Sequence, residues 1–250
     1  MFERWTPESL VRAYLHGEAR HEPDSADTCA VPPTPTIAIS RQFGAHGSEI
    51  AREVARRLGW SVYDRELLEG IAQDMQVRVS LLESVDERHV SWLEEFAEAF
   101  LLGSKVSENS YVMHLVETIV SLAARGQCVI VGRGAALVLP PSCTLRVRVV
   151  AAREDRITTL CHERSVTTRA AEHELDSIER QQLRFVKDHF QRDAADPANY
   201  DLVLNSSRWS IEQCADMIVD ALHRLSKRRA ALHPALPRAI AEVDRSPART

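Results

Sequence analysis

The sequence predicts an α/β domain built on a mostly parallel sheet with helices on both faces. Short apolar segments of strand type alternate with longer amphipathic segments of helical period, a pattern typical of parallel sheets with helical crossovers. The chain has 250 residues, of which 44% are hydrophobic and 27% are charged, as expected for one globular domain with appendages. A glycine-bearing loop after the first predicted strand indicates a ligand site at one edge of this sheet.

Composition and charge narrow the classes of protein. The formal net charge of -5 disfavours a nucleic-acid partner, and no apolar run approaches the ~20 residues that span a bilayer. Residues 1–20 lack the pattern of a signal peptide, so a cytoplasmic location without membrane contact is expected. The 5 cysteines form no C-x-x-C pair, and free thiols are expected rather than disulfides or a zinc site.

The segments before and after the predicted sheet differ from it in composition. Residues 6–20 have the pattern of a short amphipathic helix, and residues 21–35 collect Pro, Asp, Ser and Thr without periodicity. We therefore expect an N-terminal helix and linker over 1–35, the main domain over 36–226, and a disordered basic tail over 227–250.

The first strand, loop and helix lie within Thr36 to Leu58, and Gly59 is expected to cap the helix. Unpaired N–H groups at a helix N-terminus bind anions, which favours a phosphate site in the loop. The strict phosphate-loop pattern is nevertheless not met. If Ser48 supplies the hydroxyl, Gly47 stands where the lysine belongs and His46 where the second glycine belongs. Spacing alone leaves a phosphate loop and an ordinary strand-to-helix turn equally open.

The next predicted strand, Trp60 to Tyr63, ends at Asp64 and is followed by a helix to about Met75. The Asp64 carboxylate either faces the ligand side of the sheet or caps that helix, and both interpretations stay open. Helices are also predicted over 80–102 and 111–125. The second is apolar nearly all round, which predicts burial in the domain or at a homodimer contact.

Arginines follow the remaining predicted strands. Cys128 to Val131 precedes Gly132-Arg133-Gly134, where Arg133 either offers a fork to a phosphate or carboxylate or lies in a solvated turn. A helix is predicted from Thr168 to Phe190, with Arg180, Arg184 and Lys187 on one face that is either solvated or a phosphate clamp. The other elements expected in this half are the strands 145–151 and 200–205 and the helices 153–164 and 211–225.

Four blocks in order resemble the cytidylate kinase-like family, a branch of the P-loop nucleoside monophosphate kinases. They are SRQFGAHGSEIA, YDRELL, VIVGRGAALVLP and DPANYDLVLNSSRWSIEQ, within about residues 36–225. The resemblance implies a P-loop kinase-like three-layer fold with a mostly parallel five-stranded sheet, an ATP phosphate loop over 40–48, a nucleoside monophosphate pocket and a helical lid that carries arginines.

Matching positions suggest residue roles. Asp64 matches the aspartate that opens the monophosphate-binding helix, Arg133 the acceptor-contacting arginine of a G-R-D block, and Arg180 the arginine of the lid. This sequence also departs from the family pattern. The loop lysine is missing, and His46, Gly134, Glu179 and Gln182 replace residues usual in true cytidylate kinases, so selectivity for cytosine and fast turnover are in doubt.

The expected ligands are ATP, Mg²⁺ and a small nucleotide acceptor. The candidate catalytic residues are Arg41, Arg180 and Arg184. The candidate ATP-binding residues are Ser40, Gly44, Ala45, His46, Gly47, Ser48, Arg153 and Arg156. Asp64 and Arg133 are expected to bind the acceptor, and Ser48 and Asp64 the metal. Two functions follow: a kinase acting on a nucleoside monophosphate or a related small acceptor, or a catalytically weakened nucleotide-binding protein that acts as a sensor or scaffold.

Overall fold

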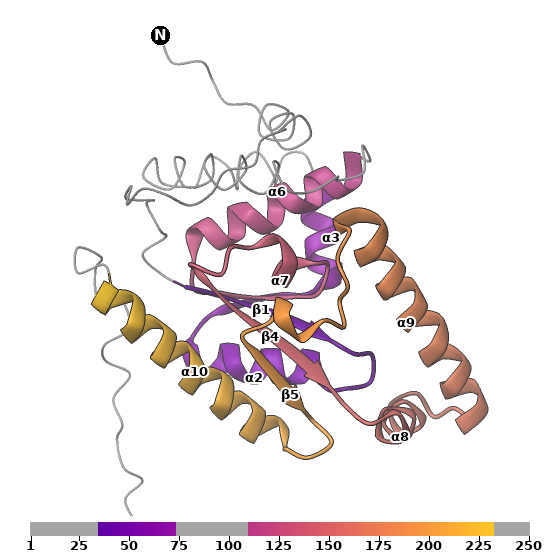
Figure 1. Ribbon diagram of the computed structural model, residues 1–250. Helices are drawn as coiled ribbons and strands as arrows, with labels where there is room; N and C mark the ends of the chain where they lie inside the picture. Colours follow the sequence, from indigo (N-terminus) through magenta and orange to yellow (C-terminus); the bar gives the residue numbers. More distant parts are fainter. Residues whose placement is uncertain (1–34, 74–109, 233–250) are drawn as a thin grey trace, which may run out of the picture.

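The computed structural model describes residues 35–73 and 110–232. In that part of the chain a five-stranded sheet, in which every pairing is parallel, has the order β2-β3-β1-β4-β5 (Figure 1). The strands are β1 (Thr36–Arg41), β2 (Ser61–Tyr63), β3 (Cys128–Val131), β4 (Thr144–Val150) and β5 (Leu202–Asn205). The predicted α/β class and parallel sheet are therefore confirmed.

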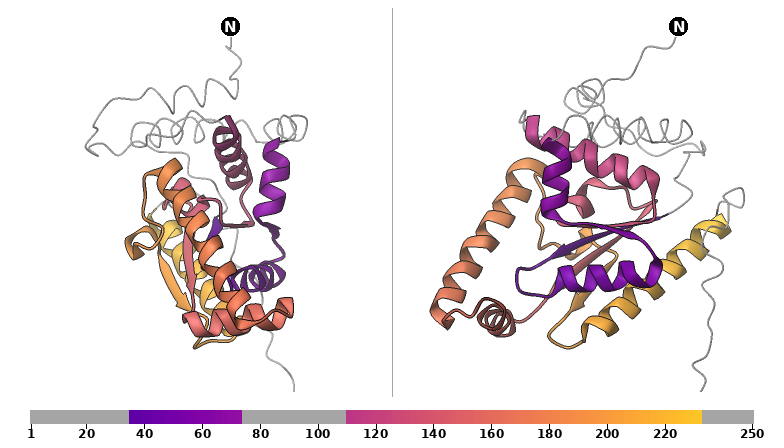
Figure 2. Two further views of the ribbon diagram at one scale, coloured as in Figure 1. Left: turned by 90° about the vertical axis from the view of Figure 1, so that its right-hand side faces the viewer. Right: turned by 180° about the vertical axis from the view of Figure 1, so that it is seen from behind.

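Helices cover both faces of the sheet. The helices of the described residues are α2 (Gly47–Leu58), α3 (Arg65–Gln73), α6 (Ser110–Arg125), α7 (Ala135–Val138), α8 (Arg153–Arg164), α9 (Thr168–Phe190), the short 3₁₀ helix η1 (Pro197–Asn199) and α10 (Ile211–Leu232). In Figures 1 and 2, α2 and α10 lie on one face, and α3, α6 and α7 lie on the other. Among the described residues, no helix combines the length and apolar character needed to cross a bilayer.

Side-chain alternation in the strands divides the apolar residues between two cores. In β1, Ile37 and Ile39 pack in the core under α2 and α10, and Ala38 packs in the core under α6 and α7. The neighbouring strand β3 follows the same rule, with Val129 in the first core and Ile130 in the second. Successive side chains of a strand point to opposite faces, so the nearly continuous apolar sequence of these central strands fills both layers.

Most predicted elements agree with the structure to within about two residues, and the last helix is the main correction. The sequence predicted its end at Leu225 and a disordered tail from 227, whereas α10 continues to Leu232. The added segment, SKRRAAL, is rich in Lys, Arg, Ala and Leu, which favour helix, and contains neither Gly nor Pro. The predictions for 1–34, for the helix 80–102 and for 233–250 lie outside the described residues.

Helix α6 buries its apolar side chains within this chain. Val112, Leu115 and Ile119 have no exposed surface and belong to the core that also contains Leu68 of α3. Burial inside the domain is the alternative to a dimer contact, and it accounts for the wide apolar face of this helix. The homodimer stays a prediction.

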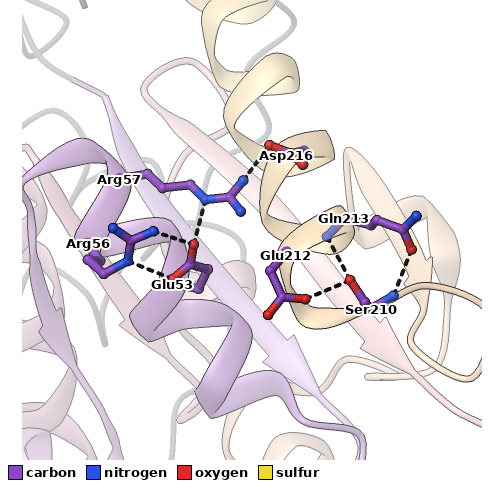
Figure 3. A network of polar contacts seen from close by, with 7 residues as sticks. All are labelled: Glu53, Arg56, Arg57, Ser210, Glu212, Gln213 and Asp216. Atoms are coloured by element: carbon purple, nitrogen blue, oxygen red, sulfur yellow. Dashed lines mark hydrogen bonds and ion pairs between the residues drawn. The ribbon is translucent and has the colours of Figure 1, made fainter. Parts of the chain in front are cut away.

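An ionic network joins α2 to α10 (Figure 3). The Glu53 carboxylate accepts two hydrogen bonds from Arg56, at 2.8 and 2.7 Å, and one from Arg57 Nε at 2.7 Å. The guanidinium of Arg57 also donates to Asp216 of α10. These contacts help to hold α2, the helix that follows the glycine loop, in a fixed position.

Candidate functional site

The glycine loop connects β1 to α2 at the carboxyl edge of the sheet. His46 is the N-cap of α2, with φ 55 and ψ 21, and no side chain caps the helix. The first N–H groups of α2 are consequently open to a ligand, and the helix dipole favours an anion there. Hydrogen bonds fix the loop to the segments next to it. Gln42 N donates to Val149 O at 3.0 Å, and Ser206 Oγ donates to Ala45 O at 2.9 Å.

Arg156 of α8 anchors the other side of this loop. Its side chain is buried and donates from Nε to Ala151 O at 3.1 Å, from Nη1 to Phe43 O at 3.4 Å, and to the Glu179 carboxylate of α9. Gly44, with φ +79, fits against it, because a Cβ there would lie 3.0 Å from Arg156 O. Arg156 thus ties both lid helices to the loop, and its predicted ATP contact stays a prediction.

The His46 ring points to the lid helix α8. Its Nε2 lies 3.2 Å from the hydroxyl oxygen of Thr159. His46 stands where a phosphate loop has its second glycine and its φ is positive, a region that histidine tolerates better than most residues. This contact keeps the ring next to the loop, and the ATP contact predicted for His46 stays a prediction.

Four arginines gather at the carboxyl edge of the sheet: Arg41, Arg65, Arg133 and Arg148. The pKa of Arg133 is lowered to about 10, first by burial and then by the charges of Arg65 and Arg41. Burial likewise lowers the pKa of Arg41; Arg65 and Arg148 add to the effect, and Asp64 opposes it. Like charges held this close disfavour one another, and an anion among them offsets that cost.

Neighbouring side chains orient two of these arginines. Arg148 Nη1 donates to Ser40 Oγ at 2.6 Å, and the Arg148 guanidinium lies 5.8 Å from the centroid of the Tyr200 ring. The Tyr200 hydroxyl is 2.8 Å from Ala194 O and 3.3 Å from Ser40 Oγ. On the other side of β1, the guanidinium of Arg133 lies 4.8 Å from the centroid of the Phe185 ring of α9.

Three residues of this edge were not predicted from the sequence: Arg65, Arg148 and Tyr200. Arg148 carried a usable signal, since Arg146 and Arg148 alternate with valines at the end of a predicted strand. Arg65 directly follows Asp64, which was already placed at a strand end. Tyr200 gave no such signal, because its contact with Ser40 joins parts of the chain that are far apart in sequence.

Asp64 caps α3, one of the two open interpretations. Its Oδ1 accepts from Leu67 N at 3.1 Å. Asp64 also directly follows β2 and is near enough to Arg41 to act on its pKa. The residue that caps α3 therefore also lies at the carboxyl edge of the sheet. The described residues contain no group of three or more His, Cys, Asp or Glu side chains that could hold a metal ion.

Magnesium often keeps several waters and is bound through phosphates with one or two protein oxygens, so a lone hydroxyl is a sufficient protein ligand for it. Ser48, in the first turn of α2, is such a residue. It makes no side-chain hydrogen bond within the described part of the chain, so its oxygen is available. Asp64 fits less well, because its carboxylate already caps α3 next to an arginine.

Helices α8 and α9 form the candidate lid at the same end of the sheet (Figure 1). Three ion pairs join them: Arg153 to Asp176 at 2.6 Å, Arg156 to Glu179, and Arg164 to Glu174. A small apolar cluster of Leu160, Ala171 and Leu175 lies between the two helices.

The predicted catalytic arginines of α9, Arg180 and Arg184, have exposed side chains. Arg180 Nε donates to Asp176 O at 2.9 Å. Within the described residues, no hydrogen bond or ion pair brings Arg180 or Arg184 to the arginine group at the sheet edge. The structure therefore gathers Ser40, Arg41, the loop, Asp64 and Arg133 at one edge and leaves these two arginines on the lid surface.

A parallel sheet with a glycine loop, an open helix N-terminus and a helical lid at one edge defines a kinase-like nucleotide-binding fold. A sequence profile of the cytidylate kinase-like family matches residues 36–208. The chain belongs to the cytidylate kinase-like family. A search of curated proteins finds no significant match.

Solved structures are similar to this chain at low sequence identity. An uncharacterized protein from Eubacterium ventriosum ATCC 27560 has 16% identity and a TM-score of 0.57, over 76% of this chain and 99% of that chain. This likeness supports the fold alone. Similarity is weaker to a shikimate kinase from Acinetobacter baumannii, in complex with shikimate (13%, TM-score 0.42, 77% and 95%). It is also weaker to a sugar kinase from Janibacter sp. HTCC2649 (17%, TM-score 0.41, 76% and 95%).

Proposed function

We propose that this protein transfers the γ-phosphoryl group of ATP to a small phosphorylated acceptor, with a nucleoside monophosphate as the leading class. The observation that carries the proposal is the group Arg41, Arg65, Arg133 and Arg148 beside the open N-terminus of α2. A single anion satisfies a helix N-terminus, whereas this edge offers enough positive charge for two phosphate-bearing ligands. Membership of the cytidylate kinase-like family supports the same conclusion.

The parts of the site divide between donor and acceptor. The loop and the first turn of α2 hold the triphosphate, and Arg133, in the turn after the neighbouring strand β3, holds the acceptor phosphate. An acceptor oxygen attacks the γ-phosphorus, the bond to the β–γ bridging oxygen breaks, and ADP leaves with that electron pair. Such a transfer needs positioning and positive charge more than covalent help. Mg²⁺, held by Ser48 and the phosphates, supplies charge neutralisation when it is bound.

The cations of the lid favour the second candidate function, nucleotide binding without transfer. Arg153 and Arg156 are engaged with Asp176 and Glu179, so α8 and α9 neutralise each other's charges in this conformation. A kinase whose lid arginines must reach the migrating phosphoryl group has to break these pairs on closure. A sensor or scaffold does not.

ADP production from ATP and Mg²⁺ with a panel of nucleoside and deoxynucleoside monophosphates separates the two functions. The kinase predicts that at least one acceptor stimulates ADP release. Arg133→Ala should then weaken that acceptor by about 2 kcal/mol, because a charge-assisted contact is lost. Arg52→Ala, an exposed change on α2, serves as the control and should leave acceptor affinity unaltered. Bound ATP with no response to any acceptor would instead support the sensor.

A further inference from the structure

The side chain of Arg41 lies across two glycines from different loops. A Cβ placed on Gly47 would lie 2.5 Å from Arg41 Cβ and 2.7 Å from Arg41 Cγ. A Cβ placed on Gly132 would lie 2.0 Å from Arg41 Nη1. Side chains do not tolerate such separations, so both positions exclude any residue larger than glycine while Arg41 keeps this position.

The backbone conformation at position 47 does not require glycine. It lies in the first turn of α2, and it is not among the residues with positive φ. A helix interior normally disfavours glycine by about 0.5–1 kcal/mol relative to alanine. The contact with Arg41 is thus the physical reason for glycine at this position.

The same position is where a phosphate loop has its lysine, if Ser48 supplies the loop hydroxyl. A lysine at 47 and the observed Arg41 cannot coexist, because their Cβ atoms would overlap. The site can therefore contain a lysine at position 47 or Arg41 in its observed position, but not both.

Among residues 35–73 and 110–232, no carboxylate pairs with the guanidinium of Arg41. The Arg41 side chain makes no hydrogen bond or ion pair within the described part of the chain. Asp64, the acidic side chain that acts on it electrostatically, is bonded to Leu67 N instead. A partly buried cation surrounded by other arginines is unfavourable until an anion binds it.

We propose that Arg41 replaces the missing loop lysine and binds the β- and γ-phosphate oxygens of the nucleoside triphosphate, with Gly47 and Gly132 providing the space that it needs. This inference rests on the proposed function and names the residue that carries its positive charge. The planar fork of arginine can contact two phosphate oxygens at once, whereas an ammonium group acts as a point charge. Arg41 also joins the donor loop to the Gly132-Arg133-Gly134 turn of the acceptor side.

The test exchanges the two cations by mutation. Arg41→Met keeps the aliphatic stem against Gly47 and removes only the fork, so it should weaken ATP binding about tenfold or more. Gly47→Lys in the parent should also weaken ATP binding, because the new side chain collides with Arg41. Arg41→Gly removes the whole side chain, including the Cβ that would collide with a side chain at position 47. Gly47→Lys should therefore strengthen ATP binding when Arg41→Gly is already present.

Calorimetric titration with ATP and Mg²⁺ measures this reversal of sign, and urea unfolding of each variant shows that it is folded. The inference is overturned if Arg41→Met binds ATP like the parent, or if Gly47→Lys changes ATP affinity equally in both backgrounds. Because the readout is ATP binding, the outcome does not depend on finding an acceptor. Conversely, acceptor-dependent ADP production with an unaffected Arg41→Met would leave the proposed function standing and remove Arg41 from it.

Discussion

Gly134 lies directly against the ring of Phe190, the last residue of α9. A Cβ on Gly134 would be 2.3 Å from Cε2 of that ring, and the φ of Gly134 is +76. True cytidylate kinases, which this sequence resembles, have an aspartate at this position. Here the buried ring of Phe190 fills the space that such a side chain requires. The departure from the family pattern at Gly134 is therefore matched by the packing of the lid helix.

Gly134→Ala should destabilise the protein by about 2–4 kcal/mol, because it adds overpacking to backbone strain. Gly59→Ala is the matched control: its φ is +68, but nothing lies within 4 Å of the added Cβ. Urea unfolding should show a larger loss of unfolding free energy for Gly134→Ala than for Gly59→Ala. Equal losses would mean that Phe190 moves aside at no cost.

Arg156→Gln should lower stability far more than Arg153→Gln, although both arginines pair with α9. The Arg156 side chain is only 6% exposed and makes two further bonds to backbone oxygens, so its removal leaves partly buried acceptors unsatisfied and costs about 2–4 kcal/mol. The Arg153 side chain is 42% exposed, so solvent screens its ion pair and its loss should change stability little.

Thermal and urea unfolding of the two variants measure this difference. ATP titration of the same variants then separates the anchoring role of Arg156 from the ATP contact predicted for both arginines. A destabilised Arg156→Gln that still binds ATP like the parent would leave only the anchoring role. Equal stability losses for the two variants would contradict the burial argument.

Glu53→Gln should make the stability of the protein less dependent on acidic pH. Hydrogen bonds from Arg56 and Arg57 lower the pKa of Glu53 from 4.5 to about 2. A carboxylate with a depressed pKa stabilises the fold at neutral pH, and this contribution is lost as pH falls from 4.5 to about 2. Unfolding free energies measured across that range should fall less steeply in the variant. Glu163→Gln, at an exposed position of α8, should keep the parental slope.

Alkylation by iodoacetamide at about pH 8 should modify Cys161 before the other described cysteines, since the thiolate is the reactive form and must also be accessible. Burial raises the pKa of Cys128 to about 12 and also raises the pKa of Cys214, and Cys143 is buried as well. Peptide mass spectrometry of the native protein measures the order of modification. In urea all four should react at similar rates. Early modification of Cys128 in the native protein would contradict the buried position of its side chain.

The sequence by itself determined the class of the fold and the candidate loop. Alternating strand and helix patterns gave the parallel sheet, because the two periods of hydrophobic residues are local properties of the chain. The cap formed by Asp64 also follows from residues close in sequence. For the same reason the ends of α8 and α9 were predicted correctly.

Only the tertiary structure decided which residues share the site. The strand order places β3 next to β1, so Gly132 comes to lie under the guanidinium of Arg41. It also places Arg148 of β4 beside Ser40 of β1, and the packing of α9 brings Phe185 next to Arg133. No local pattern encodes these contacts, because each depends on how side chains from separate strands and helices pack at one edge of the sheet. Local periodicity fixes the elements, and packing of distant segments selects the partners of each arginine.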